Sequence, residues 1–284
     1  MSVAGEVKSL AVSVMPRWRR FANNATKWLR LLVRHPRATA RPAWRAPARI
    51  AAWGVPALAA IAATMVIADR AAIVAVQGLP LWVGDFFNVL TDYGTSDWFL
   101  VPIAVVLVLI AAFVPPALPR MSRLVLVALS VRLGFVFTAI AVPGLFATIV
   151  KRLIGRARPF LAGDASPFHY LPFSWRPDYA SLPSGHATNV FAALIAIGLV
   201  APRLRAPMLV YALVIATSRV IVLAHHPSDV LAGALVGTVG ALMVRDWFAA
   251  RALGFVVAPD GSVRKLPGPS LRRLMAVARQ FAAA

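Results

Sequence analysis

Six long runs of apolar residues dominate this chain of 284 residues. They cover roughly residues 51–69, 98–114, 124–150, 187–201, 207–224 and 230–248. A helix needs about 20 apolar residues to cross the hydrocarbon core of a bilayer, so runs of this length predict membrane spans. The second and fourth runs lie at the short end of that range. Because hydrophobic residues make up 60% of the sequence, we predict an all-α, polytopic bundle of six transmembrane helices with short interfacial helices.

Basic residues are concentrated on one side of the predicted membrane domain. Residues 1–50 contain eleven Lys and Arg against the single acid Glu6, and residues from 245 onward add seven more basic residues. Short connections on the same side add Arg120, Arg123, Arg203 and Arg205. Lys and Arg accumulate in cytoplasmic loops, so this side and both termini are predicted to be cytoplasmic. The net charge of +20 is therefore explained by the orientation of the chain in the membrane, because the Lys and Arg residues lie mainly on its cytoplasmic side. Nucleic-acid binding is not expected.

These counts divide the chain into three parts: a basic cytoplasmic N-terminal arm (1–50), a six-span domain (51–248) and a basic cytoplasmic tail (249–284). In the arm, apolar residues recur with spacings of three and four between Trp18 and Leu32, with basic residues among them. This pattern predicts either a helix lying on the anionic cytoplasmic leaflet or a basic tail without regular structure. Between the first two spans, the pattern from Trp82 to Leu90 indicates either a short interfacial helix on the opposite face or a segment that packs into the core.

The opposite side is nearly neutral and carries three short polar runs. Seven basic residues there are balanced by seven aspartates: Asp69, Asp85, Asp92, Asp97, Asp164, Asp178 and Asp229. Ionisable residues at the ends of membrane spans are costly and mark functional sites by default. The absence of cysteine excludes disulfides and thiolate metal sites. Any catalytic chemistry is therefore expected in the three polar runs.

The first polar run pairs two cations at the end of the third predicted span. Lys151 and Arg158 are seven residues apart, which places them on one face of a helix, two turns apart. Pro159 disfavours helix at the residue before it, so Arg158 is expected where the chain leaves the helix. Two cations directed at one point suit a dianionic phosphate, although snorkelling alone also places basic residues at span ends.

The second run, Pro-Ser-Gly-His at 183–186, precedes the fourth apolar run. Ser184 is expected to cap the helix, and Gly185 leaves the backbone open to a ligand. The free N–H groups and the positive end of the helix dipole favour an anion at this place. His186 is expected to face the same space as a proton donor. A simple helix cap would explain Ser184 but not the histidine beside it.

The third run ends the fifth apolar run and contains Ser218 and Arg219, then His225 and Asp229. A helical rise of 1.5 Å per residue places His225 about 9 Å beyond Arg219, a distance that the long Arg side chain largely covers. Asp229 falls in the first turn of the next helix, where its carboxylate holds one nitrogen of His225 and leaves the other free to attack. His226 is the competing nucleophile, and we interpret it as an interfacial polar residue.

Together the three runs resemble the signature motifs of the type 2 phosphatidic acid phosphatase family: Lys-x6-Arg-Pro, Pro-Ser-Gly-His and Ser-Arg-x5-His-x3-Asp. Every defining position matches, and the resemblance covers about residues 51–248. It implies that His225 is a nucleophile forming a phosphohistidine, that Asp229 orients it, and that His186 protonates the leaving oxygen and then activates water. It further implies that the phosphoryl oxygens are held by Lys151, Arg158, Ser184, Gly185 and Arg219. Such family members work without a metal, so no cofactor is expected.

We therefore expect a metal-independent, integral membrane phosphatase acting on an envelope lipid at the periplasmic face of a bacterial inner membrane. Its candidate substrates are phosphatidic acid, phosphatidylglycerophosphate, polyprenyl diphosphate and the phosphates of lipid A. A phosphotransferase that passes the phosphate to another lipid would use the same site. A vanadate-dependent haloperoxidase, which resembles the family in its anion site, is disfavoured by six spans. A transporter or scaffold would leave the paired histidines without a role, and small-residue faces such as Gly233 and Gly237 fit a monomer and an oligomer equally.

Overall fold

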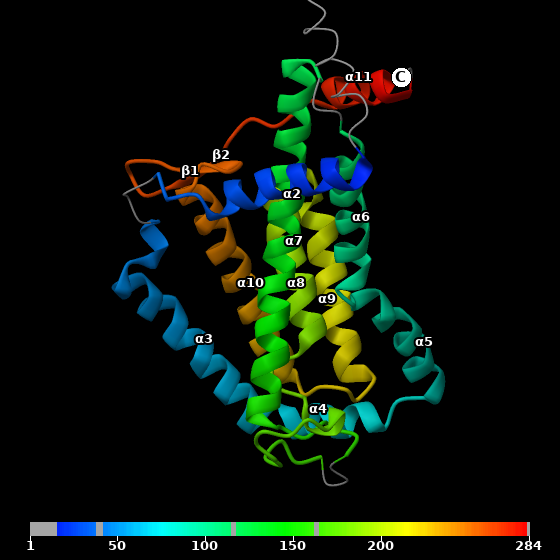
Figure 1. The fold of residues 1–284 in the computed structure, drawn as a ribbon. Coiled ribbons are helices and arrows are strands. Elements are labelled where there is room, and N and C mark those ends of the chain that lie inside the picture. Colours follow the sequence, from blue (N-terminus) through cyan, green and yellow to red (C-terminus); the bar gives the residue numbers. More distant parts are fainter. Residues whose placement is uncertain (1–15, 38–41, 115–117, 162–164, 283–284) are drawn as a thin grey trace, which may run out of the picture.

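The computed structural model describes residues 16–37, 42–114, 118–161 and 165–282, and the chain is mainly helical within these ranges (Figure 1). Glu6 and Asp164, which entered the charge counts, lie outside the described residues. The helices are α2 (Arg17–Val33), α3 (Pro47–Ile67), α4 (Asp69–Gln77), α5 (Leu81–Thr91), α6 (Asp97–Phe113), α7 (Arg120–Ile154), α8 (Gly185–Val200), α9 (Arg205–Ile221), α10 (Pro227–Ala250) and α11 (Leu271–Ala282). A short antiparallel hairpin pairs β1 (Phe255–Val257) with β2 (Val263–Lys265).

Each of the six apolar runs forms a helix, and the predicted all-α, polytopic fold is confirmed. Among the described residues, stretches containing α3, α5–α6, α7, α9 and α10 are long and apolar enough to cross a membrane. Helix α8 has 16 residues, which is about 24 Å at 1.5 Å per residue and falls below that length. A helix is present as α5 where the sequence predicts one between the first two spans, and a tight turn at Asp92–Gly94 joins it to α6.

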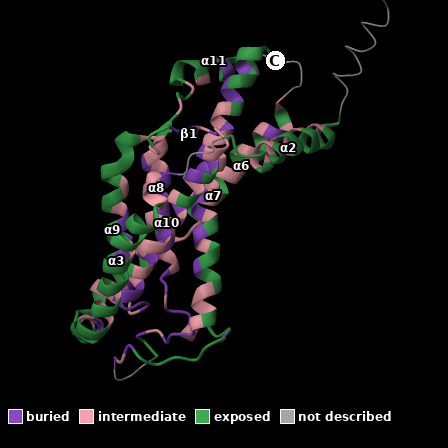
Figure 2. Ribbon diagram, turned by 90° about the vertical axis from the view of Figure 1, so that its left-hand side faces the viewer, coloured by how far each residue is buried: buried purple, intermediate pink, exposed green. Residues whose placement is uncertain are grey.

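Helix α8 lies inside the bundle, against α7, α9 and α10. Figure 2 shows buried residues along α7, α8 and α10, and much of the buried side of α8 consists of alanine. Two glycines of α10 allow very close packing: a Cβ at Gly237 would lie 2.2 Å from the carbonyl oxygen of Thr188, and a Cβ at Gly233 would lie 2.5 Å from that of Ser184. Small residues thus bring the backbones of α8 and α10 into direct contact.

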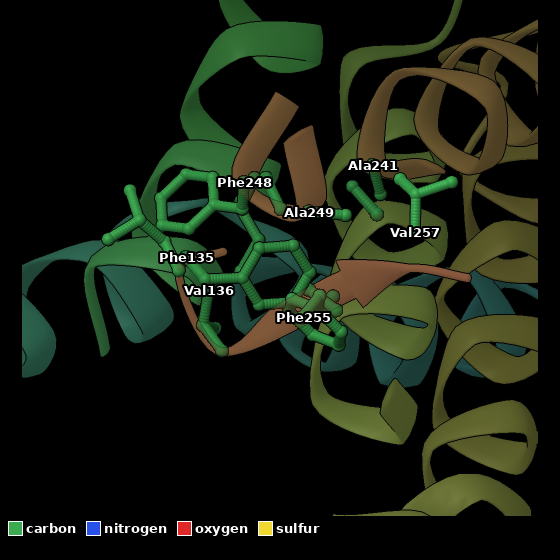
Figure 3. Packing of buried hydrophobic residues seen from close by; sticks show 13 residues of the cluster. Phe135, Val136, Ala241, Phe248, Ala249, Phe255 and Val257 are labelled. Atoms are coloured by element: carbon green, nitrogen blue, oxygen red, sulfur yellow. The ribbon is translucent and has the colours of Figure 1, made fainter. Parts of the chain in front are cut away.

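An aromatic core closes the end of the bundle that carries the hairpin (Figure 3). The ring of Phe135 on α7 packs edge-on against Phe248 of α10 and Phe255 of β1, with ring centroids 5.5 and 4.8 Å apart. Val257 of β1 belongs to the same buried cluster. Because such edge-on pairs are favourable, they attach the segment after α10 firmly to the membrane bundle.

Helix α3 stands to one side of the bundle in Figure 1. It buries none of its 21 residues, and Trp53 and Val66 are more than two thirds exposed. A helix that is apolar all round and uncovered by protein is typical of a segment surrounded by lipid. The exposed apolar side chains of α3 therefore agree with a membrane-embedded fold.

The N-terminal arm contains a helix, so the alternative of an arm without regular structure is wrong for residues 17–33. Helix α2 crosses the bundle near α6, where the Asn24 side chain donates a hydrogen bond of 2.9 Å to the carbonyl oxygen of Ala111 (Figure 1). Further along, Trp44 and Arg45 bind the Asp246 carboxylate at 2.8 and 3.0 Å. These contacts hold the arm and the end of α10 together, opposite the three polar runs.

Candidate active site

The first polar run is shaped by a chain reversal at Gly155. Helix α7 ends at Ile154, and Gly155 adopts the left-handed conformation with φ of 64°, donating its N–H to the carbonyl oxygen of Lys151. A Cβ on Gly155 would lie 1.8 Å from the carbonyl oxygen of Leu171, so only glycine fits this C-cap. The prediction that Lys151 and Arg158 share one helical face is therefore wrong: Arg158 lies in the loop beyond the turn.

The loop nevertheless holds Arg158 in a defined place. Its backbone N–H donates a hydrogen bond of 2.8 Å to the carbonyl oxygen of Asp178. This bond joins the beginning of the loop to a later part of the same loop. Burial lowers the pKa of the Arg158 guanidinium below its ordinary value. In addition, the Nε atom of Arg158 has no hydrogen-bond partner within the described part of the chain. A partly buried guanidinium with an unused donor is suited to bind an anion.

The second run begins α8 as the sequence predicts. Ser184 has extended backbone angles, and its hydroxyl accepts a hydrogen bond of 3.4 Å from the N–H of Ala187. Gly185 is the first helical residue, and a Cβ placed there would lie 3.7 Å from Nζ of Lys151. The end of the Lys151 side chain therefore reaches the N-terminus of α8. A cation and free helix N–H groups meet at one place, which favours a phosphate group.

His186 lies in the first turn of α8 and packs against the turn between α5 and α6. A Cβ on Gly94 of that turn would lie 2.9 Å from Cδ2 of the His186 ring. The same region supports the third run, because Thr91 accepts a hydrogen bond of 2.6 Å from Nη1 of Arg219. Thr91 also accepts one of 3.0 Å from the Ser218 hydroxyl. The end of the predicted interfacial helix thus forms one wall of the site.

Arg219 and His225 lie closer together in space than they would on a continuous helix. Helix α9 ends at Ile221, and the N–H groups of Ala224 and His225 both donate to the carbonyl oxygen of Arg219 at 3.1 Å. Leu223 takes a positive φ of 55° in this reversal. The expectation of a 9 Å helical rise is therefore wrong, because the chain turns back instead of continuing upward.

The carboxylate of Asp229 faces the Nδ1 side of His225, as the sequence predicts. Oδ2 of Asp229 lies 3.8 Å from Nδ1 of His225, and the two are bridged by the Ser181 hydroxyl. Ser181 donates 2.5 Å to Oδ2 and lies 3.5 Å from Nδ1. Since Nδ1 is turned towards the carboxylate and hydroxyl, Nε2 is the nitrogen left for substrate.

His225 is held in the neutral form. The residue is 2% exposed, and burial lowers the pKa of its imidazole to about 4. The charges of Arg219 and Arg158 act in the same direction, while Asp229 opposes them. A neutral imidazole with an unprotonated nitrogen is the form that acts as a nucleophile.

His226, which the sequence suggests as a polar residue at the membrane interface, is buried within the protein. It is 1% exposed, and its backbone N–H donates 2.8 Å to Oδ2 of Asp229. That bond caps the N-terminus of α10. Nδ1 of the His226 ring lies 3.5 Å from Oδ2 of Asp229. The structure therefore gives His226 a position behind the carboxylate, in the interior of the protein.

Three cations gather at this end of the bundle and repel one another, while Asp178 attracts Arg158 and Asp92 attracts Arg219. Lys151 is repelled by both Arg158 and Arg219. The Nε atom of Arg219, like that of Arg158, lacks a hydrogen-bond partner within the described ranges. Buried charges are normally paired, so a cluster of this kind calls for a bound anion. No group of three or more His, Asp or Glu residues suited to hold a metal ion occurs among the described residues.

Four polar residues that the sequence did not single out complete the site: Asp69, Arg156, Ser181 and Ser228. All four are buried, and they bind Asp229 or one another. In the sequence, Arg156 adjoins the first motif without belonging to its defining positions, and Asp69 is one of the acids of the outer side. The signal available for Arg156 was its place inside the first run, whereas nothing near Asp69 in the sequence indicates its partners.

Residues 132–253 match the model of the PAP2 superfamily. The chain is 36% identical over 204 residues to a lipid A 1-phosphatase of Rhizobium etli, covering 71% of this chain and 86% of the relative. It is 37% identical over 132 residues to a decaprenylphosphoryl-5-phosphoribose phosphatase of Mycobacterium tuberculosis, covering 45% and 63% respectively.

A crystal structure of a transmembrane PAP2-type phosphatidylglycerolphosphate phosphatase from Bacillus subtilis aligns with 68% of this chain and 92% of its own, at 21% identity and a TM-score of 0.47. The family match and the long alignment with the Rhizobium etli protein agree with the three polar runs. This chain therefore belongs to the PAP2 superfamily, the type 2 phosphatidic acid phosphatases.

Proposed function

We propose that this membrane lipid phosphatase removes a phosphate from an envelope lipid through a phosphohistidine formed on His225, without a metal. The observation that carries the proposal is the setting of His225, whose Nδ1 side is occupied by Asp229 and Ser181. Three cations gather at the same end of the bundle: Lys151, Arg158 and Arg219. A held imidazole beside a cation cluster supplies the nucleophile and the charge stabilisation that phosphoryl transfer needs.

In the first step, the Nε2 lone pair of neutral His225 attacks phosphorus while the bond from phosphorus to the lipid oxygen breaks. Burial and the neighbouring cations lower the pKa of His186 to about 3 in the free site, so we propose that His186 takes up a proton when the phosphate dianion binds. It gives that proton to the leaving oxygen, so the lipid departs as an alcohol or, from a diphosphate, as a monophosphate. His225 now carries the phosphoryl group on Nε2 and a proton on Nδ1. It is therefore cationic, and its positive charge faces the carboxylate of Asp229.

In the second step, water attacks phosphorus while neutral His186 accepts one proton from it. The bond between phosphorus and Nε2 breaks, which returns His225 to its neutral form and releases inorganic phosphate. Lys151, Arg158 and Arg219 would hold the phosphoryl oxygens in both steps, together with the Ser184 hydroxyl and the backbone N–H of Gly185. The cycle ends with both histidines in their starting forms.

Lipid A 1-phosphate is the substrate that we propose first. Its support is the lipid A 1-phosphatase of Rhizobium etli, with which this chain aligns over 86% of that protein's length. Phosphatidic acid, phosphatidylglycerophosphate and polyprenyl diphosphate are the competing substrates for the same site. Each has a phosphate at the membrane surface, where the three polar runs lie at one end of an apolar bundle.

We further propose that the site faces the periplasm of a bacterial inner membrane and that both termini are cytoplasmic. The support is the distribution of charge, since the arm and tail carry most of the Lys and Arg. The arm helix α2 would then lie at the anionic cytoplasmic leaflet, where its basic residues are attracted to lipid headgroups.

The test follows inorganic phosphate release by purified protein in detergent, with a chelator present, across lipid A and the three competing lipids. Wild-type protein and His225→Ala are measured side by side. Release that requires His225 and survives the chelator supports the proposal, and the best substrate identifies the lipid. Equal release by wild type and His225→Ala, or release that stops with the chelator, contradicts it. Release only when a second lipid is added as acceptor would instead indicate a phosphotransferase.

A further inference from the structure

Arg156 lies at the centre of a buried polar network. Its side chain is fully buried and donates hydrogen bonds in three directions. Nη1 binds Oδ1 of Asp229 at 2.5 Å and the Ser228 hydroxyl at 2.8 Å, and Nε binds the carbonyl oxygen of Pro167 at 2.9 Å. Nη2 binds Oδ2 of Asp69 at 2.7 Å. One guanidinium therefore bridges two buried carboxylates.

Asp69 comes from a distant part of the chain. It is the first residue of α4, directly after the lipid-facing helix α3, and it is fully buried. Oδ1 accepts the N–H of Ser228 at 2.9 Å, and Oδ2 accepts the Ser228 hydroxyl at 2.5 Å. Asp69 thus contacts the residue next to Asp229 and the cation that binds Asp229, but it does not touch His225.

The two carboxylate oxygens of Asp229 have different partners. Oδ1 is bound by Arg156, whereas Oδ2 receives the Ser181 hydroxyl and the N–H of His226 and faces His225. This arrangement aims Oδ2 at the imidazole. It also creates an electrostatic problem, because a buried arginine bound to Asp229 alone would cancel the negative charge that His225 requires.

Counting charges shows how the structure avoids this cancellation. Arg156 contributes one positive charge, and Asp69 and Asp229 contribute one negative charge each, so the buried group carries a net charge of −1. Burial alone would lower the pKa of Arg156, but the two carboxylates outweigh it and raise that pKa, which keeps the guanidinium charged. Without Asp69, the same group would be neutral.

We propose that Asp69 is a positioning residue that compensates the charge of Arg156, so that Asp229 keeps its negative charge for His225 when the imidazole becomes cationic. The inference rests on the proposed role of His225 as the nucleophile. Arg156 then sets the direction of the Asp229 carboxylate. Asp69 prevents the positive charge of Arg156 from cancelling the negative charge of Asp229. The reacting atoms never meet Asp69, which acts only through the other two residues.

A purely structural role predicts a different outcome from charge compensation. If Asp69 only ties α4 to α10, its removal lowers stability and leaves the protonation of His225 unchanged. If it compensates charge, removal leaves the positive charge of Arg156 uncompensated and disfavours a proton on His225. Other charged and titratable groups facing His225 come from the elements around it: Asp229, Arg219, His186, Arg158 and His226. None of them changes in the variants below.

The test compares Asp69→Asn, Arg156→Gln and the double variant in the full-length protein. Asp69→Asn keeps the shape but removes the charge, so kcat should fall roughly tenfold or more and KM should change little, a loss typical of outer partners of a functional histidine. The acid limb of kcat/KM should move to lower pH. In the double variant the group again carries −1, so kcat and the acid limb should return towards the wild-type values.

Ser228→Ala is the matched control, because it removes a hydroxyl from the same network without changing charge. It should lower the thermal unfolding temperature and leave the acid limb in place. Folding of every variant is checked by size-exclusion chromatography and thermal unfolding in detergent. Losses that add up in the double variant, with an unmoved acid limb in Asp69→Asn, would overturn the inference. Activity of His225→Ala equal to that of wild type would instead overturn the proposed function itself.

Discussion

The backbone N–H of His225 donates a hydrogen bond of 3.1 Å to the carbonyl oxygen of Arg219. A single reversal of the chain therefore sets the distance between the proposed nucleophile and one of the cations that would bind phosphate. The backbone, rather than two flexible side chains, fixes this part of the site. That arrangement suits a reaction in which positioning and charge stabilisation do most of the work.

The two adjacent histidines are expected to differ sharply in their effect on catalysis. His225→Ala removes the proposed nucleophile, so kcat should fall by at least about a thousandfold, as for other nucleophile deletions. His226→Ala removes a buried ring behind the Asp229 carboxylate, so it should lower stability and leave phosphate release measurable. Single-turnover phosphate release and thermal unfolding measure the two effects. Abolished release in His226→Ala with full activity in His225→Ala would reverse the assignment.

Asp229→Asn is expected to lower kcat much more than it changes KM. The amide cannot stabilise the cationic form of His225, whereas the cations proposed to bind phosphate remain in place. Steady-state kinetics on the best lipid substrate separates the two parameters. A large rise in KM with an unchanged kcat would show that Asp229 serves only as the helix cap of α10.

Replacing Gly155 should disturb the first polar run through its backbone. Gly155→Ala forces an alanine to φ of 64° and places Cβ 1.8 Å from the carbonyl oxygen of Leu171. Strain of this kind costs about 1–3 kcal/mol, so the unfolding temperature should fall and KM for the lipid phosphate should rise. Gly134→Ala on the same helix is the control, because nothing lies within 4 Å of its Cβ. Equal behaviour of the two variants would contradict this account.

Activity should persist at a pH well below the ordinary titration of histidine. Burial lowers the pKa of His225 from 6.5 to about 4, so the neutral nucleophile remains present as the pH falls until about 4 and is lost below it. The acid limb of kcat/KM reports this pKa in the free enzyme. The free energy of unfolding should decrease as the pH falls from about 6.5 to about 4. In this range the imidazole of His225 takes up a proton in the unfolded chain but not in the folded chain. An acid limb near 6.5 in kcat/KM would disprove a buried, neutral His225.

Single cysteines can test which side of the membrane carries the site, because the chain contains no native cysteine. Trp175→Cys lies exposed in the loop before α8, and Asp260→Cys lies exposed in the turn of the hairpin at the other end. In intact cells with a permeabilised outer membrane, a maleimide that cannot cross the inner membrane should label the first and spare the second. The reverse pattern would place the site in the cytoplasm.

Spans and caps were predictable because their signals are local. Continuous apolar runs marked the helices, and Ser184 was recognised as the cap of α8 from its neighbours in sequence. The contact between Asp229 and His225 was also predictable. The two residues are four apart on either side of the start of α10, so their side chains can take few relative positions. In each case the physical cause lies within a few residues of the feature itself.

What could not be predicted depends on contacts between distant residues. The reversal at Gly155 becomes obligatory only when Leu171 lies against it, and nothing within the first run shows that contact. Arg156 and Asp69 are 87 residues apart, and each looked like an ordinary charge at a span end. The burial of His226 likewise follows from how α10 meets its neighbours.

The close contact of α8 and α10 has a consequence for how this protein could acquire new specificities. Gly233 and Gly237 leave no gap between the two helices, so the elements carrying Ser184, His186 and Asp229 behave as one rigid body. Adaptation to a different lipid headgroup must then occur elsewhere, at exposed side chains of α3 and of the loop before α8, and not at the buried Asp69 of α4 or Thr91 of α5. We expect the positions of Ser184, His186 and Asp229 to stay the same when the substrate changes. Exposed side chains around them can then be substituted with little loss of catalytic activity.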